Sequence, residues 1–517
     1  MKTKFFLLLA FTLIATEIFS QTQIEYRSDY GFIRPESPND IVLTKNVVFV
    51  HEGMTMHCDS AIYNAKENYF FAFSNINMYQ ADTIHLTGDE LHYYGNDKIG
   101  ELSGKQVILE DGKLTMQTDY LLLDRNDNTV KYLTGANIWD DKNTLNSKEG
   151  IYFIDDKKFL FLYNVELTSP DAVINTDTMS YNTKNKESEF LGQTHILTND
   201  STKVNALGGT YNTKNDIVFS DKRPQIWTKE QYIVADTIYY DRKLKNGYSK
   251  GNIYVEDTTN DMRLNCGSIT LNTIDSISTA IIYDSSLVRQ INKEDTLYFH
   301  SDTMHIVMDT TYNVKDIFAY NHCKFFRSDM QGACEYAHYN KKDSILTMLI
   351  RPILWSEESQ LTADTIIMKI NDKEVEYLNM MPNTFIVQNS DTNTKEYFNQ
   401  VSGKNLMGYF AKNKLYYAEI DGNTNSIYFV WDENKKKKTK TLTGVNIGTS
   451  KLLHLYFNKG KLKQMSAIKN PQFYMDNYEN IAENERRLKG FLFKEDDKPT
   501  KPQDIFIKRL WQDDTFL

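Results

Sequence analysis

The sequence predicts an all-β fold, an elongated β-solenoid of roughly 30-residue repeats that is followed by a short C-terminal helix and tail. Three observations predict it. The 517 residues include 33 Tyr and 28 Phe but only nine Pro, a composition that favours extended structure. Short stretches alternate apolar and polar residues, as strands with one dry and one wet face do. One order of turn, strand, turn and strand then recurs about every 30 residues.

The first element is a predicted secretory signal peptide, residues 1–20. Lys2 and Lys4 precede an apolar run from Phe5 to Ile14, which is too short to span a membrane. Cleavage after Ser20 would leave 517 − 20 = 497 residues, enough for a large core or several domains. No Cys lies near that point, which argues against a lipoprotein anchor. We therefore expect a soluble, exported protein.

Residues 21–370 carry the repeats. Each repeat has an anchor residue on its second strand, and the steps between anchors are 30, 30, 30, 28, 30, 29 and 31 residues. In most copies the residue two positions earlier is also apolar and its neighbours are polar, which predicts one dry strand face. The anchors are Tyr63, Tyr93, Leu123, Phe153, Tyr181, Tyr211, Tyr240 and Leu271, with looser copies at Ile306, Tyr339, Met368 and Tyr409.

A second column of large apolar residues precedes the first. Its members are Phe49, Tyr79, Leu109, Trp139, Leu167, Leu197, Trp227, Phe325 and Trp355. A turn residue that tolerates positive φ stands just before most of them, namely Asn46, Asn75, Gly104, Gly135, Asn164, Gly192, Gly251 or Asn321. Acidic turn residues follow the column. One 30-residue unit could not bury its apolar face alone, so stacked neighbours must form the core.

The repeats become irregular towards the C-terminus. Residues 371–470 read as a more divergent β region, and residues 471–517 as a helix with a charged tail. The segment Lys435–Lys438 reads as a solvated loop, although its four lysines could also meet phosphates of a lipid or a partner.

Cysteine and charge exclude some classes of function. A net charge of −10 makes nucleic acid a poor partner, because phosphates require basic surface. Cys58, Cys266, Cys323 and Cys334 show no C-x-x-C spacing, so we expect packed free thiols, with a Cys323–Cys334 bridge as the alternative.

No catalytic, metal or cofactor site is predicted. A carboxylate stands four residues before nine anchors, at Asp59, Asp89, Asp119, Glu149, Asp177, Asp236, Asp302, Glu335 and Asp364. These could form a calcium-binding ladder, but we favour hydration of the strand starts, because catalytic pairs are local. His92, His305 and His338 are expected at the surface. We expect no enzymatic activity, with a polysaccharide-acting β-helix enzyme as a weak alternative.

Three short motifs allow a modification. Asp177-Thr178-Met179, Asp236-Thr237-Ile238 and Asp364-Thr365-Ile366 are similar to an O-glycosylation motif of some exported bacterial proteins. They also occupy a fixed place in the repeat, so they can mark strand starts alone.

The repeat resembles the OstA-like family. The resemblance lies in a turn Gly-Asn, an apolar strand, an acidic turn and then Asp-x-apolar-x-Tyr, as in Gly251-Asn252-Ile253-Tyr254 and Asp236-Thr237-Ile238-Tyr239-Tyr240. The family includes the LptA-type periplasmic bridge of lipopolysaccharide transport and the N-terminal domain of the LptD outer-membrane receptor. It implies a β-jellyroll folded like a taco whose apolar interior holds lipid acyl chains.

The resemblance also implies partners and a location. We expect lipopolysaccharide, bound through its lipid A acyl chains, inner-membrane Lpt transporter components, an LptD-like receptor, and end-to-end self-association, in the periplasm and in association with the outer membrane. The main alternative is a structural or adhesive β-solenoid with a filled core. The candidate groove residues are Tyr63, Tyr93, Leu123, Phe153, Tyr181, Tyr211, Tyr240, Leu271, Phe49, Tyr79, Leu109, Trp139, Trp227 and Trp355.

Overall fold

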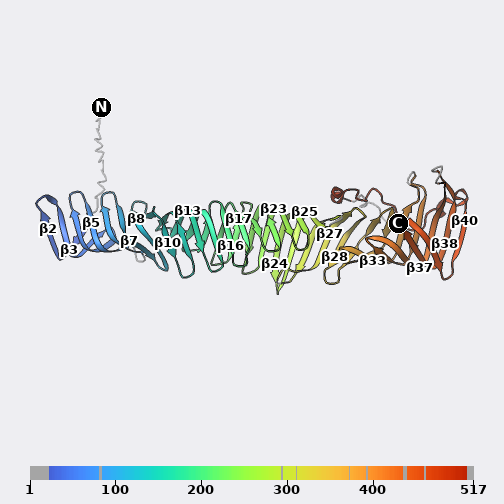
Figure 1. Cartoon of the computed structure of the whole chain (residues 1–517), viewed down its shortest axis with the longest axis horizontal. Helices are drawn as coiled ribbons and strands as arrows, with labels where there is room; N and C mark the ends of the chain where they lie inside the picture. Colours follow the sequence, from blue (N-terminus) through green and yellow to red (C-terminus); the bar gives the residue numbers. More distant parts are fainter. Residues whose placement is uncertain are drawn as a thin grey trace, which may run out of the picture. The chain divides into compact units, whose positions relative to one another are not determined.

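The computed structural model confirms an all-β fold (Figure 1). It describes residues 23–80, 84–292, 295–309, 311–371, 373–391, 394–434, 439–458 and 461–508. The predicted signal peptide and Lys435–Lys438 lie outside these described residues. The chain forms two compact units, unit 1 up to Thr198 and unit 2 from Asn199, and each is described by itself.

Unit 1 consists of antiparallel strands that follow one another in chain order. Its strands are β1 (Glu25–Arg27), β2 (Tyr30–Arg34), β3 (Ser37–His51), β4 (Met54–Asn64), β5 (Tyr69–Gln80), β6 (Ile84–Tyr94), β7 (Ile99–Asp111), β8 (Leu114–Asp124), β9 (Thr129–Tyr132), β10 (Ala136–Trp139), β11 (Thr144–Ser147), β12 (Glu149–Phe153), β13 (Lys158–Thr168), β14 (Ala172–Asn182), β15 (Glu187–Phe190) and β16 (Thr194–Thr198).

Unit 2 continues the same antiparallel pattern. Its strands are β17 (Lys203–Ala206), β18 (Gly209–Asn212), β19 (Ile217–Ser220), β20 (Gln225–Trp227), β21 (Gln231–Val234), β22 (Thr237–Asp241), β23 (Asn246–Asp257), β24 (Met262–Ile274), β25 (Ile277–Ile291), β26 (Thr296–Met308), β27 (Val314–Arg327), β28 (Met330–Asn340), β29 (Ile345–Leu349), β30 (Ile353–Ser356), β31 (Ser359–Thr362), β32 (Thr365–Asn371), β33 (Glu374–Met381), β34 (Thr384–Asn389), β35 (Phe398–Gly403), β36 (Asn405–Ala411), β37 (Lys414–Asn434), β38 (Thr439–Asn458), β39 (Lys461–Ile468) and β40 (Gln472–Asp476).

The long strands are bent in the middle, and this bend explains the 30-residue repeat. In β3 the pairing with β4 shifts register between Thr44 and Val47, and Lys45 and Asn46 at the shift have φ of 63° and 50°. The chain therefore runs along one wall, bends, and runs along a second wall before the next strand returns. One outward and one returning strand, with their turns, take about 30 residues.

Four terms describe this geometry. Wall 1 holds the segment before the bend of β3, Ser37–Thr44, and the strand segments paired in series with it, and wall 2 holds the segment after the bend, Val47–His51, and its partners. The row of bends is the spine, and the hairpin turns at the opposite ends of the two walls form the rim. Most turn residues that the sequence indicated lie at the spine with positive φ, among them Asn46, Asn75, Gly135, Asn164, Gly251 and Asn321.

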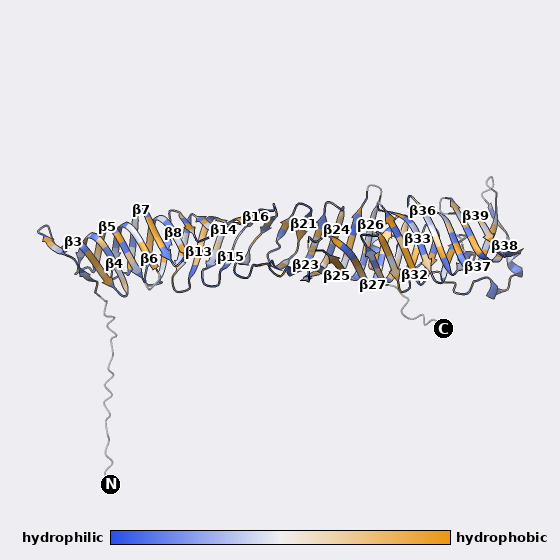
Figure 2. Ribbon diagram, turned by 90° about the horizontal axis from the view of Figure 1, so that it is seen from below, coloured by the Kyte–Doolittle hydropathy of each residue, from blue (hydrophilic) through white to orange (hydrophobic). Residues whose placement is uncertain are grey.

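The walls pack face to face. Phe49 of wall 2 stacks on Phe70 of wall 1 with ring centroids 3.9 Å apart, and lies 5.9 Å from the ring of Tyr63. All three side chains are at most 1% exposed. Apolar residues alternate with polar ones along strands such as β4, β5 and β7, as Figure 2 shows. The core of each unit therefore lies between its walls.

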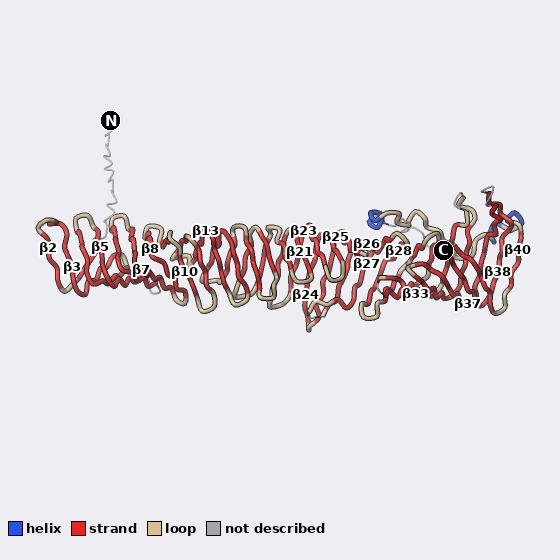
Figure 3. The backbone as a smooth tube through the Cα atoms, viewed as in Figure 1, coloured by secondary structure: helices blue, strands red, loops and turns tan. Residues whose placement is uncertain are grey.

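The predicted C-terminal helix is wrong. The described residues after β40 contain three short 3₁₀ turns, η1 (Tyr478–Asn480), η2 (Glu483–Glu485) and η3 (Pro502–Phe506). Figure 3 shows these helical turns beside β40 and near β26. The segment packs on the outer surface of unit 2 instead of forming a helix, and the tail up to Lys508 is part of the packed structure.

Candidate functional site: the interior between the walls

A ladder of directly paired residues runs along the inner face of wall 1. In unit 1 this inner ladder 1 is Ile41, Tyr63, Phe70, Tyr93, Gly100, Leu123, Val130, Tyr152, Phe159 and Tyr181. In unit 2 it includes Tyr211, Val218, Tyr240, Gly247, Leu271, Ala280 and Ile306. Directly paired residues project from the same face of a sheet, so seven of the eight first-column candidates share one inner face.

Phe153 is the exception. It pairs with Lys158 and Thr129, whereas its neighbour Tyr152 pairs with Val130 and Phe159 and is 1% exposed. The face assigned to Phe153 is therefore wrong, because the copy around β12 is one residue shorter than a step of 30 assumes. A shift of one residue turns a side chain to the other face.

The second predicted column divides between the two faces of wall 2. The inner ladder of wall 2 in unit 1 contains Phe49, Met56, Met78, Leu86, Leu109, Met116, Ile138, Leu145, Leu167, Ile174 and Ile196. Phe49 and Leu109 thus face inward, and both are 0% exposed.

The predictions for Tyr79, Trp139, Trp227 and Trp355 named the wrong face. Met78 and Ile138 face inward, while the adjacent Tyr79 and Trp139 are 46% and 36% exposed. Trp227 pairs with Lys203 and Tyr232 on the outer face. Trp355 also projects outward, and it is buried there against Leu492 of the C-terminal segment.

The interior of unit 1 is filled along most of its strands. The inward side chains from β3 to β11 are at most 5% exposed, as Phe49, Tyr93, Leu109 and Leu145 illustrate. Only at the last strands does exposure rise, where Leu167, Tyr181 and Ile196 are half-buried. Burial raises the pKa of Tyr181 to about 12, so its hydroxyl stays uncharged at neutral pH.

Polar contacts connect the two walls of unit 1 at the rim. The guanidinium of Arg125, on wall 1, donates to the carbonyl oxygens of His51 and Glu52, on wall 2, at 2.9 and 2.8 Å. The ammonium of Lys98 lies 2.9 Å from the Glu52 carboxylate. Further contacts join Gln80 to Asn128 at 2.9 Å and Lys157 to Asp111 at 2.9 Å. These contacts hold the mouth of unit 1 shut.

Unit 2 has an open stretch from β17 to β26. Inward side chains beside the spine are buried there, as Ile253 and Met304 are, each at 1% exposure. Those nearer the rim are all half-buried, on wall 1 Tyr211, Val218, Tyr240, Leu271 and Ile306, and on wall 2 Val204, Ile226, Ile233, Val255, Leu264, Val288 and Phe299. The walls thus meet at the spine and leave apolar surface accessible towards the rim.

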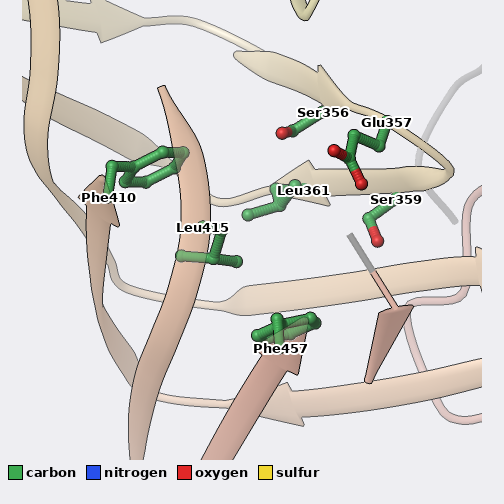
Figure 4. Close-up of a pocket in the computed structure, with 7 residues that line it drawn as sticks. All are labelled: Ser356, Glu357, Ser359, Leu361, Phe410, Leu415 and Phe457. Carbon is green, nitrogen blue, oxygen red and sulfur yellow. The ribbon is translucent and has the colours of Figure 1, made fainter. Parts of the chain in front are cut away.

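The interior of unit 2 closes again from β28 to β38, which we call the closed stretch. Its inward residues Leu354, Leu378, Ala418 and Leu455 are at most 1% exposed. Figure 4 shows the rim of this stretch, where Phe410, Leu415 and Phe457 lie across from Leu361 and the turn Ser356–Ser359, leaving a shallow pocket.

The carboxylates of the spine hold the bends together. Asp59, Asp236 and Asp364 accept hydrogen bonds from the side-chain amides of Asn75, Asn252 and Asn383, at 2.6, 2.7 and 2.9 Å. Asp89 accepts one from the backbone N–H of Lys105, Asp119 one from the Thr134 hydroxyl, and Asp302 and Glu335 both contact His322. These residues secure each bend against its neighbour, a more specific structural role than hydrating strand starts.

Histidines and cysteines form no metal site within the described residues, where no group of three or more His, Cys, Asp or Glu could hold an ion. His92 contacts Glu90 at 2.7 Å and His338 contacts Asp316 at 2.8 Å, each in its own place. All four cysteines are free and buried. Cys323 and Cys334 are directly paired on neighbouring strands. No described helix is long and apolar enough to cross a membrane.

Comparison with known proteins gives one family. Residues 21–177, that is 157 of 517 residues (177 − 21 + 1), match the family described as OstA-like protein. This match confirms the predicted family for that part of the chain. No curated protein matches the chain.

One similar solved structure is LptH from Pseudomonas aeruginosa, the LptA homologous periplasmic component of the conserved lipopolysaccharide transport device. The two share 9% identity over 32% of this chain and 82% of that chain, with a TM-score of 0.10. A likeness of that extent supports no conclusion about fold or function.

Proposed function

We propose, from the premise that residues 21–177 are OstA-like, that this protein binds lipopolysaccharide and carries it across the periplasm. In this proposal the acyl chains lie between the walls and the sugar and phosphate groups project from the mouth. The protein performs no covalent chemistry. Its partners are inner-membrane Lpt transporter components and an LptD-like receptor at the outer membrane.

The open stretch of unit 2 is the observation that carries the proposal. Two apolar ladders face each other there, and their side chains nearer the rim are only half-buried, among them Tyr240, Leu271 and Val255. Burying a methylene group is worth about 0.8 kcal/mol, so a 12-carbon acyl chain left in water would cost roughly 10 kcal/mol. A mouth lined with half-buried apolar side chains supplies cover for such a chain.

Lateral continuity of the ladders supports movement of the lipid along the molecule. Each rung of unit 2 from β18 to β26 presents apolar side chains of similar character, so neighbouring positions should bind an acyl chain with similar free energy. The tyrosines of this stretch add no charge, because burial raises the pKa of Tyr211 and of Tyr240.

The outermost strands support the bridging part of the proposal. β2 pairs with β3, and its Tyr30, Phe32 and Ile33 are 50–59% exposed. At the other end of the chain β40 pairs with β38 and exposes Phe473, Tyr474 and Met475. Exposed apolar strands are suited to strand addition by a second copy or by another Lpt component.

Photo-crosslinking in living cells tests the proposal. A photoreactive amino acid replaces Tyr240, which faces inward, or the adjacent Tyr239, which stacks on Tyr248 on the outer face at 5.2 Å. The expected result is a lipopolysaccharide adduct at position 240 and none at 239. If both exported, folded variants lack an adduct, the structural or adhesive solenoid becomes the better explanation.

A further inference from the structure

The segment after β40 runs back across the outer face of wall 2 in unit 2. We call residues 477–508 the C-terminal strap. Tyr478 and Ile481 pack on Phe429, Leu488 contacts Phe398, and Leu492 contacts Trp355. The strap therefore passes over β37, β35 and β30 in turn, and it ends near β26 and β27, where η3 lies (Figure 1).

Two buried glutamines fix the backbone of the strap. The side-chain amide of Gln400 donates to the carbonyl oxygen of Arg486 at 2.9 Å and accepts from the backbone N–H of Leu488 at 2.8 Å. Gln360 repeats the arrangement with the carbonyl oxygen of Leu492 at 2.7 Å and the N–H of Lys494 at 2.8 Å. Gln400 is 0% and Gln360 1% exposed.

The end of the strap is also anchored. The ammonium of Lys324, which is 3% exposed, donates to the carbonyl oxygen of Ile507 at 2.6 Å. The ring of Phe506 lies 4.7 Å from that of His300. Between these points, the ammonium of Lys498 donates to the carbonyl oxygen of Glu357 at the rim, at 2.9 Å.

The extent of the strap coincides with the closed stretch. From β28 to β38, wall 2 is packed on both faces, inward through residues such as Leu354 and outward through residues such as Trp355, which are 0% and 2% exposed. Where the strap packs on wall 2, moving that wall outward breaks two sets of contacts. In the open stretch, the inward side chains nearer the rim are already half-buried.

We propose that the C-terminal strap is a latch that keeps the closed stretch of unit 2 shut, and that its release lets wall 2 move outward and admits an acyl chain. This inference rests on the proposed function for the identity of the chain admitted. The latch itself is a statement about the walls, so it can be tested without lipid.

Native cysteines report on the opening. Cys323 and Cys334 belong to the interior cluster of unit 2 and are 1% and 2% exposed, while Cys58 lies in the interior of unit 1 at 6%. In the reduced, full-length protein, Gln360→Ala combined with Gln400→Ala should raise the rate of N-ethylmaleimide labelling at Cys323 and Cys334 at least about tenfold, because removing the side-chain amides leaves buried groups of the strap without partners. Labelling at Cys58 should stay unchanged, and mass spectrometry resolves the sites.

Gln331→Ala is the matched control. Gln331 lies in the same outer row as Trp355 and is 5% exposed, yet its amide donates to its own turn, at the carbonyl oxygen of Arg327, 2.6 Å away. This variant should leave the labelling rates at wild-type values. A second variant carries a protease site after Asp476 in the full chain, so that the strap is cut only after folding. Unchanged labelling of Cys323 and Cys334 after both perturbations overturns the latch.

A lipid readout separates the two proposals. A photoreactive group at Leu378, an inward residue of the closed stretch that is 0% exposed, should crosslink to lipopolysaccharide only when the strap is released. Faster labelling of the thiols without an adduct at either Leu378 or Tyr240 supports the latch and counts against lipid binding. An adduct at Tyr240 with thiol labelling that release does not change supports lipid binding and overturns the latch.

Discussion

Replacing Phe49 by Ala tests the assignment of faces in unit 1. Phe49 is 0% exposed and stacks on Phe70, with ring centroids 3.9 Å apart. Truncating a buried Phe costs about 3–5 kcal/mol, because transfer free energy is lost and a cavity remains. Since about 1.4 kcal/mol is a factor of ten, local opening of the walls should become roughly 150- to 4,000-fold more frequent.

Hydrogen exchange measures this opening directly. Amides of β3, β4 and β5 in the full-length variant should lose protection by that factor under conditions where exchange reports the opening equilibrium. Tyr79→Ala is the control, because Tyr79 belongs to the same sequence column but is 46% exposed and stacks only on the surface, 4.6 Å from His85. Its protection should fall by less than about sixfold. Equal losses in the two variants would refute the separation of inner and outer faces.

Three further outcomes follow from the spine and the cysteines. Asp59→Ala removes the acceptor of the Asn75 amide and should destabilise the pairing of β4 with β5 by about 1 kcal/mol in the same exchange measurement, with Asp59→Asn losing less. Burial raises the pKa of Cys58 to about 12, so native alkylation by iodoacetamide should not rise between pH 7 and 9.5, although it does so in guanidinium. Because the folded pKa lies above the unfolded one of about 8.5, this thiol contributes stability below that pH, and the contribution falls as pH rises towards 12. Added oxidised glutathione should bridge Cys323 to Cys334 alone, because Cys58 and Cys266 face Val47 and Ile253 across the strands, and peptide mapping identifies the bridge.

The first apolar column was predictable because it lies on wall 1, where the returning strand has nearly constant length. Seven of its eight residues form inner ladder 1 of their unit. The eighth, Phe153, fails where Gly150 shortens the side-chain space. A Cβ at Gly150 would lie 2.5 Å from a ring carbon of Tyr132, so Tyr152, not Phe153, continues the ladder.

The second column was harder, because wall 2 carries large apolar residues on both faces. In Met78-Tyr79 and Ile138-Trp139 the larger aromatic residue lies outside and the aliphatic one inside. Residue size and a period of 30 do not distinguish adjacent positions, and strand parity depends on where the bend occurs.

The strap was missed for a different reason. Its charged, helix-like composition indicates local preference, while Gln360, Gln400 and the aromatic residues that bind it are 80 or more residues earlier in the chain. Alternation in β30 and β35 did signal two apolar faces, and a wall that is apolar on both faces requires a second partner.

The contacts along the spine have a consequence for molecular length. Asp59 secures the bend at Asn75, and Asp236 the bend at Asn252, so each carboxylate acts on the next bend and on nothing more distant. A repeat can then be duplicated or deleted without disturbing any contact beyond its two neighbours. Because a repeat contributes two strands spaced about 4.8 Å apart, each such event changes the length of its unit by about 10 Å. Gene segments of about 90 nucleotides thus set a ruler, by which the span of such a unit can be matched to the distance between two membranes.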